Sequence, residues 1–219
     1  MPILTDRLEF YHVPRTGGSW LAKRLARWHK RIPIGFHKVG ESHDMPLAKR
    51  DEEAERVRFT ITREPFEWLK SWYRCKLAAH LDKRTWCGGV PHGLMFSDCP
   101  LDEGFRTYLQ FYLAAHPGRA SSIWLTYMER TDVWLRTDRL TEGLKELFAH
   151  VDMTELELDR LAPGKGFNST PDDDVGRWPC DAPDELIDRW KMAEAPLYDA
   201  YEAAWDGNDA NLYDNNPTD

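Results

Sequence analysis

A strand, a glycine turn and a helix follow one another near the start of this chain, and this order constrains the fold more than any other feature. Leu8–Val13 (LEFYHV) is a short apolar run typical of a buried strand, and Pro14 and the Gly17-Gly18 pair end it. From about Ser19 onward, apolar residues recur at helical spacing. A strand that leads through such a turn into a helix predicts one unit of an α/β fold.

The same order recurs further along the chain. Val57–Thr62 (VRFTIT) is rich in β-branched residues and alternates apolar and polar residues as a strand does, and Pro65 then stands where a helix begins. Val133–Arg136 is another strand candidate and precedes an amphipathic helix. We therefore predict an α/β fold, P-loop-like and three-layered, with a central, mainly parallel β-sheet flanked by helices. The other expected elements are a strand at Pro33–Phe36, helices at Leu47–Arg56, Asp102–His116 and Pro183–Trp205 with a kink at Pro196, and loops at Leu81–Pro100 and Ala162–Asp181.

Length and charge narrow the functional class. The 219 residues predict one domain over residues 1–205 and a frayed acidic tail over residues 206–219. The net charge of −8, from 37 acidic and 29 basic residues, argues against nucleic acid as a partner but leaves room for a small basic pocket that binds an anion. No apolar run approaches the roughly 18 residues of a membrane span, and the start of the chain carries no secretory signal. We therefore expect a cytoplasmic protein.

The cysteines and the tryptophans each support a further expectation. The four cysteines lie far apart and form no C-x-x-C pair, so we expect separate reduced thiols and no zinc site; they are Cys75, Cys87, Cys99 and Cys180. Ten tryptophans are an unusual number, and they indicate either a tryptophan-rich core or an aromatic binding cleft.

The turn after the first strand has the composition of a phosphate-binding loop. Gly17 and Gly18 let the backbone curl so that several N–H groups point into one concavity, and the following helix adds the positive end of its dipole. Arg15, Thr16 and Ser19 supply further donors. The Walker A pattern, in which a lysine follows the last glycine, is absent.

A second segment of interest begins in the strand Val57–Thr62. This strand delivers Arg63 to its carboxyl end, the edge at which open α/β sheets bind their ligands. Ser71 lies eight positions further on, two turns into the next helix.

Together these two segments resemble the sulfotransferases that use 3′-phosphoadenosine 5′-phosphosulfate, in particular the small carbohydrate-sulfotransferase-like branch. Pro14–Trp20 is similar to the first motif of that superfamily, and Phe59–Tyr73 is similar to the second, with the same separation between arginine and serine. Val133–Met153 looks like the family's later strand, acidic turn and helix, and Gly164–Ser169 looks like its cofactor-covering loop. The likeness runs over nearly the whole chain.

The resemblance implies a role for each matching residue. The turn from Arg15 to Ser19 would hold the 5′-phosphosulfate, and Arg63 and Ser71 would hold the 3′-phosphate. Many relatives have lysine at the position of Arg15, whose planar guanidinium still neutralises charge on the leaving phosphate. Trp20 is either an adenine-stacking residue or a core residue, and Lys165 is expected to close over the 3′-phosphate. The expected cofactor-binding residues are thus Arg15, Thr16, Gly17, Gly18, Ser19, Trp20, Arg63, Ser71 and Lys165.

The implied reaction is in-line transfer of a sulfuryl group to a hydroxyl or amine, with 3′,5′-adenosine bisphosphate as the second product. We expect no metal, because Arg15 and backbone N–H groups supply the positive charge that the leaving group needs. An alcohol acceptor also needs a general base. His43, twenty residues before Arg63, is the first candidate, ahead of His37 and Glu41.

The acceptor and two other functions remain open at this point. We expect a small molecule or an intracellular glycan or lipid precursor as acceptor, in a pocket shaped by the loop Leu81–Pro100 and the aromatic stretch Tyr108–Tyr112. The alternatives are a kinase-like phosphoryl transferase and a non-catalytic nucleotide-binding protein. The missing Walker lysine, and the lack of a clear Mg²⁺-binding aspartate at a strand end, argue against the kinase.

Overall fold

The computed structural model describes residues 3–4, 8–13, 15–18, 21, 37–38, 56–82, 100–129, 131–151 and 178–204. Five strands form one sheet in the order β3-β1-β2-β4-β5; they are β1 (Ile3–Leu4), β2 (Leu8–Tyr11), β3 (His37–Lys38), β4 (Val57–Thr62) and β5 (Val133–Arg136). The neighbours β2, β4 and β5 pair in parallel, and the short strands β1 and β3 pair antiparallel. The α/β class is therefore confirmed, with a parallel part of three strands.

β4 is the central strand of the parallel part. Its last four residues are buried on both faces, as expected for a strand that has a neighbour on each side. β2 and β5 alternate buried and half-buried residues, so each turns one face more fully into the core. The predicted strand Val57–Thr62 and the predicted strand Val133–Arg136 are confirmed at both ends.

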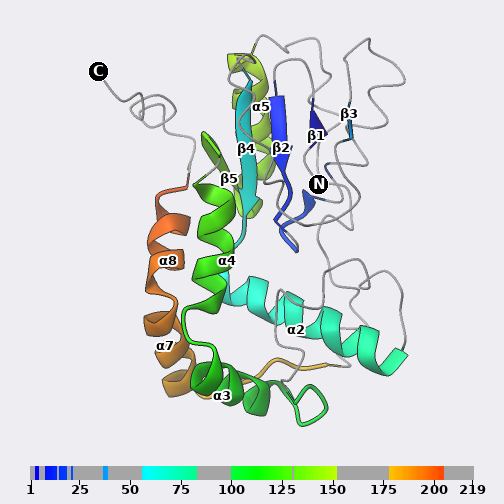
Figure 1. The fold of residues 1–219 in the computed structure, drawn as a ribbon, viewed down its shortest axis with the longest axis vertical. Helices are drawn as coiled ribbons and strands as arrows, with labels where there is room; N and C mark the ends of the chain where they lie inside the picture. The colour runs from blue at the N-terminus through cyan, green and yellow to red at the C-terminus, as the bar shows by residue number, and fades with distance from the viewer. Residues whose placement is uncertain are drawn as a thin grey trace.

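Six helices accompany the sheet in the described part of the chain. They are α2 (Pro65–Asp82), α3 (Phe105–Ala115), α4 (Arg119–Met128), α5 (Leu140–His150), α7 (Asp184–Ala193) and α8 (Ala195–Glu202), and a short 3₁₀ turn, η2 (Thr137–Arg139), joins β5 to α5. Figure 1 shows α5 beside the sheet, and α2, α3, α4, α7 and α8 gathered beyond the end of β4 that leads into α2. Among the described residues, no helix combines the length and the apolar character that a membrane span requires.

Two helix predictions need correction, and one helix was not predicted. The helix expected over Asp102–His116 begins only at Phe105, after Gly104 with its positive φ of 89°. The helix α4 was not predicted. The single kinked helix expected over Pro183–Trp205 is two helices that break at Glu194, just before Pro196 in the first turn of α8.

Several other expectations lie outside the described residues. These are the strand Pro33–Phe36, the helix Leu47–Arg56 apart from its last residue, most of the loops Leu81–Pro100 and Ala162–Asp181, and the tail 206–219.

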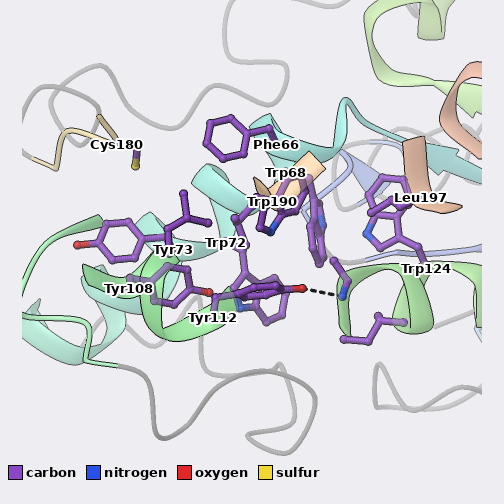
Figure 2. Packing of buried hydrophobic residues seen from close by; sticks show 14 of the residues in the cluster. Phe66, Trp68, Trp72, Tyr73, Tyr108, Tyr112, Trp124, Cys180, Trp190 and Leu197 are labelled. Carbon is purple, nitrogen blue, oxygen red and sulfur yellow. Dashed lines mark hydrogen bonds between the residues drawn. The ribbon is translucent and has the colours of Figure 1, made fainter. Parts of the chain in front are cut away.

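Aromatic side chains form the core of the helical half. Trp68 lies at the centre, with its ring centroid 5.7 Å from that of Trp72 and 5.4 Å from that of Trp124 (Figure 2). The tryptophans that the structure shows as buried are Trp68, Trp72, Trp124, Trp178 and Trp190. Of the two interpretations of the tryptophan content, the core therefore accounts for these five residues.

Tyr108 and Tyr112 belong to the same core. Their exposed fractions are 1% and 0%, so the expectation that this stretch of α3 lines an acceptor pocket is wrong for both residues. Their rings point inward because α3 turns its apolar face toward α7 and toward Tyr73 of α2.

One fully buried carboxylate, that of Glu194, connects four helices. Its Oε1 accepts a hydrogen bond of 2.5 Å from the hydroxyl of Tyr112 on α3, and its Oε2 accepts bonds of 2.7 and 2.6 Å from the backbone N–H and the hydroxyl of Ser121 on α4. The Tyr112 hydroxyl in turn accepts the N–H of Ala120 at 2.8 Å (Figure 2). Burial and the neighbouring carboxylate raise the pKa of Tyr112, so this hydroxyl keeps the proton that it donates. Glu194 itself lies between α7 and α8.

Cys75 on α2 is disulfide-bonded, and its partner lies outside the described residues. The expectation of four separate thiols is therefore wrong for Cys75. Cys180 is a free, buried thiol, and burial raises its pKa to about 11, so it stays protonated at neutral pH.

We predict that Glu194→Ala lowers the free energy of unfolding by about 3 kcal/mol or more, because it leaves several buried donors without their charged acceptor. Urea denaturation at neutral pH measures the loss. Glu202→Ala is the matched control, since Glu202 is an exposed glutamate at the end of α8. Equal stability of the two variants would contradict a structural role for the buried carboxylate.

Candidate functional site

The parallel strands bring three connections to one edge of the sheet. Tyr11 at the end of β2 pairs with Thr60 of β4, and Thr62 at the end of β4 pairs with Arg136 at the end of β5. Because the three strands run in the same direction, the residues that follow them lie at the carboxyl edge, where ligands of open α/β sheets bind. The chain places the turn 15–18 after β2, Arg63 after β4 and Thr137 after β5.

The turn after β2, residues 15–18, has the curled backbone that its sequence predicts. Arg15 has a φ of 70° and Gly17 a φ of 95°, both in the left-handed region. The hydroxyl of Thr16 donates to the carbonyl of Val13 at 2.8 Å, and the carbonyl of Gly17 accepts the N–H of Leu21 at 3.3 Å, which begins the next helix. For arginine this φ is strained, and strain of this kind concentrates at functional sites. Left-handed residues of this kind are typical of turns whose amide N–H groups face an anion.

Arg15 reaches from this turn to α2. Its Nε and Nη2 both donate to the hydroxyl oxygen of Ser71, at 3.1 and 2.9 Å. The two residues are 56 positions apart in the chain, and each belongs to one of the two segments that the sequence singled out. The structure thus brings both segments together through a direct contact between predicted site residues.

Arg63 lies close enough to act on Arg15, and Arg74 close enough to act on Arg63; we call these three arginines and Ser71 the cationic site. Burial, and then the charge of Arg63, lower the pKa of Arg15 to about 10. Burial also lowers the pKa of Arg63. The charges of Glu67 and Glu64 raise this pKa, and the charge of Arg74 lowers it. Arg15 remains protonated at neutral pH, and a bound anion would relieve the repulsion within the cationic site.

The first turn of α2 holds the cationic site in place. The carboxylate of Glu64 accepts the N–H of Glu67 at 2.6 Å and the hydroxyl of Tyr198 at 3.1 Å. It therefore caps α2 and ties it to α8 at the point where Arg63 leaves the sheet. Further along α2, the Nε of Arg74 donates to the carbonyl of Trp178 at 3.1 Å.

Thr137, in η2, lies between the other two strand ends. Its hydroxyl is within hydrogen-bond distance of the carbonyl of Thr16 in the turn, at 3.3 Å, and closer still to the carbonyl of Thr62 at the end of β4. Sequence reasoning did not single out Thr137 or Arg74. Arg74 stands three residues after Ser71, on the same face of the helix, and this spacing was a signal that could have found it.

His12 packs directly beneath the turn. It follows β2, is only 9% exposed and stacks on Phe10 with 6.0 Å between the ring centroids. A Cβ atom on Gly18 would lie 2.0 Å from the Cδ2 of His12, so the ring fills the space that a side chain would need. Gly18 is thus required for close packing, whereas Gly17 is required for its positive φ.

The structure leaves part of the predicted site undescribed. Ser19, Trp20, Glu41, His43 and Lys165 lie outside the described residues. His37 is in β3, where it pairs with Leu4 of β1, and Leu4 pairs with Glu9 of β2. This register places the backbone of His37 two strands away from β2 and level with its second residue, so the structure does not bring His37 to the cationic site.

The carboxylate that follows β5 is already paired. Asp138 accepts two hydrogen bonds from Arg136, at 3.1 and 2.8 Å, and the guanidinium lowers the pKa of Asp138. Within the described ranges, no three His, Cys, Asp or Glu side chains gather as a metal-binding group would.

Comparison of this chain with protein-family models, with curated proteins and with solved structures found no match. The resemblance to sulfotransferases therefore stays a prediction from the sequence segments quoted above.

We predict that Gly18→Ala lowers the free energy of unfolding by about 1–3 kcal/mol, because the new methyl group displaces the His12 ring from a packed position. The same substitution in a His12→Ala background should cost less, since the smaller side chain leaves room for the methyl group. Urea denaturation of the four proteins closes a double-mutant cycle. If Gly18→Ala costs the same in both backgrounds, the ring contact is not what requires glycine.

Proposed function

We propose that this protein is a sulfotransferase that moves a sulfuryl group from 3′-phosphoadenosine 5′-phosphosulfate to a hydroxyl or amine. The observation that carries the proposal is the pair of hydrogen bonds from Arg15 to Ser71, with Arg63 close enough to lower the pKa of Arg15. These contacts join the two segments that resemble the superfamily's motifs into one cationic site at the carboxyl edge of a parallel sheet.

The described residues fit a donor with phosphate groups at both ends of its ribose. In our proposal the turn 15–18 and the Arg15 guanidinium hold the 5′-phosphosulfate, while Arg63 and Ser71 hold the 3′-phosphate. Half-buried guanidinium groups that repel one another supply a reason to bind a multiply charged anion there. A P-loop-like arrangement of the sheet and helices is part of the same proposal.

The proposed chemistry needs an oriented donor, positive charge at the leaving oxygen and a general base. The cationic site orients the donor for in-line attack, and the curled turn offers N–H groups to the oxygen that leaves with the nucleotide. Arg15 adds a positive charge that is already fixed by Ser71 and costs no rearrangement during transfer. His43 would accept the proton of the acceptor hydroxyl as the sulfur–oxygen bond forms.

The proposed acceptor is a small molecule, glycan or lipid that carries a hydroxyl or amine. The disulfide bond at Cys75 favours an acceptor that the protein meets in an oxidising compartment, because cytosolic thiols are kept reduced. It thereby argues against the cytoplasmic location expected from the sequence.

We predict that calorimetric titration detects binding of 3′,5′-adenosine bisphosphate and that Arg63→Ala weakens it about 30-fold or more, because a charge partner of the buried phosphate is lost. ATP and 5′-AMP, which lack a 3′-phosphate, should bind much more weakly. Arg189→Ala, which removes an exposed arginine of α7, is the control with the same change in net charge.

Two results of this titration would contradict the proposal. Binding that does not depend on the 3′-phosphate, with ATP preferred, would favour a kinase-like phosphoryl transferase. No binding of any nucleotide would remove the basis for the proposed donor.

We predict that His43→Ala lowers the rate of sulfuryl transfer by about 10²- to 10⁴-fold, because an alcohol then loses its proton without a general base. Release of 3′,5′-adenosine bisphosphate from the donor measures the rate, with a mixed panel of phenols, sugars and sterols as acceptors. Binding of the bisphosphate should stay unchanged. His80→Ala is the control, since His80 is exposed and paired with Asp102 at 3.2 Å. Unchanged transfer by His43→Ala would leave Glu41 as the candidate base, because the register of β3 keeps His37 away from the cationic site.

A further inference from the structure

The side chain of Thr137 contacts both the turn that follows β2 and the last residue of β4. Its hydroxyl lies 3.3 Å from the carbonyl oxygen of Thr16, in the turn after β2, and closer to that of Thr62, the residue before Arg63. The sequence separations are 121 and 75 residues, so only the packing of the sheet creates this arrangement. A hydroxyl has one proton, so the two contacts form a three-centre hydrogen bond, with its shorter branch to Thr62 and its longer branch to Thr16.

We infer that Thr137 is a positioning residue that sets the distance between the two halves of the donor site. This inference rests on the proposed function, in which the turn 15–18 holds the 5′ end of the donor and Arg63 holds its 3′ end. Thr137 touches neither of those groups. It fixes the backbone of the residue next to each, Thr16 beside Arg15 and Thr62 beside Arg63.

The neighbours of Thr137 hold it in place. Arg136 donates two hydrogen bonds to Asp138 and lies over the ring of Tyr201, 4.5 Å from its centroid. The residues on both sides of Thr137 are thereby locked to each other and to α8. A second threonine bond works in the same direction, since the hydroxyl of Thr62 donates to the carbonyl of Leu135 at 3.2 Å.

A fixed distance matters only for a ligand that uses both halves of the site at once. Such a ligand gains affinity when the two halves of the site are already at the right distance. Once one end of the ligand is bound, the other end can then bind without a further loss of conformational entropy in the protein. 3′,5′-Adenosine bisphosphate is a ligand of this kind. 5′-AMP uses the turn alone, and 3′-AMP uses Arg63 and Ser71 alone.

We predict that Thr137→Val weakens binding of 3′,5′-adenosine bisphosphate about tenfold, the loss expected for one hydrogen bond, while binding of 5′-AMP and 3′-AMP changes much less. Valine keeps the shape of threonine and removes the hydroxyl. Thr137→Ser keeps the hydroxyl and should restore the affinity of the wild-type protein. Calorimetric titration of the three proteins with the three nucleotides measures the effect. Equal weakening of all three nucleotides, or no rescue by serine, would overturn the inference.

Hydrogen exchange without any nucleotide separates this inference from the proposed function. In Thr137→Val, amides in residues 15–18 should exchange faster than in the wild-type protein and in Thr137→Ser, because the turn has lost its tie to the end of β4. Unchanged exchange would overturn the positioning role even if the bisphosphate binds. The wild-type protein could instead fail to bind the bisphosphate while Thr137→Val still exchanges faster. That result would contradict the proposed function and support the role of Thr137 in positioning the turn.

Discussion

Parallel pairing of β2, β4 and β5 is the constraint on which the candidate site depends. In an antiparallel sheet the connections after successive strands would alternate between opposite edges. Here the turn 15–18, Arg63 and Thr137 all follow a parallel strand and therefore meet at one edge. The burial of both faces of β4 supports the same pairing, because a central parallel strand needs a cover on each side. The contact between Arg15 and Ser71 depends on this direction of the chain.

The cationic site is electrostatically unfavourable by itself. Arg15 and Arg63 are half-buried, and Arg63 is close enough to lower the pKa of Arg15, although the protein as a whole carries a net charge of −8. A fold that maintains such a group must stabilise it elsewhere, and the capping of α2 by Glu64 and the aromatic core beneath α2 are the visible means. A concentrated positive charge on a negatively charged protein is what a specific anion site requires, as distinct from a broad surface for nucleic acid.

The helical half depends on a polar contact of a different kind. Glu194 is a charged group with no exposed surface, yet each of its oxygens accepts at least one hydrogen bond. The energy of removing this carboxylate from water is offset only while α3, α4, α7 and α8 keep their relative positions. α8 in turn holds Glu64 through Tyr198 and packs against Arg136 through Tyr201. The network at Glu194 is therefore connected, through α8, to the two strand ends that bear on the site.

Local features were determined by the sequence itself. The strands at Val57–Thr62 and Val133–Arg136, the helix from Pro65 and the curled turn at Gly17 depend on side-chain alternation, on proline and on glycine, all of which act over a few residues. The break at Glu194 and the burial of Tyr108 and Tyr112 could not be predicted from the sequence, since each depends on side chains far away in the chain. The same reason applies to the site. The sequence by itself pointed to Arg15, Arg63 and Ser71. Only the tertiary structure joined Arg15 to Ser71 and placed Thr137 between the turn 15–18 and the end of β4, because hydrogen bonds across 56 to 121 residues exist only once the sheet has paired.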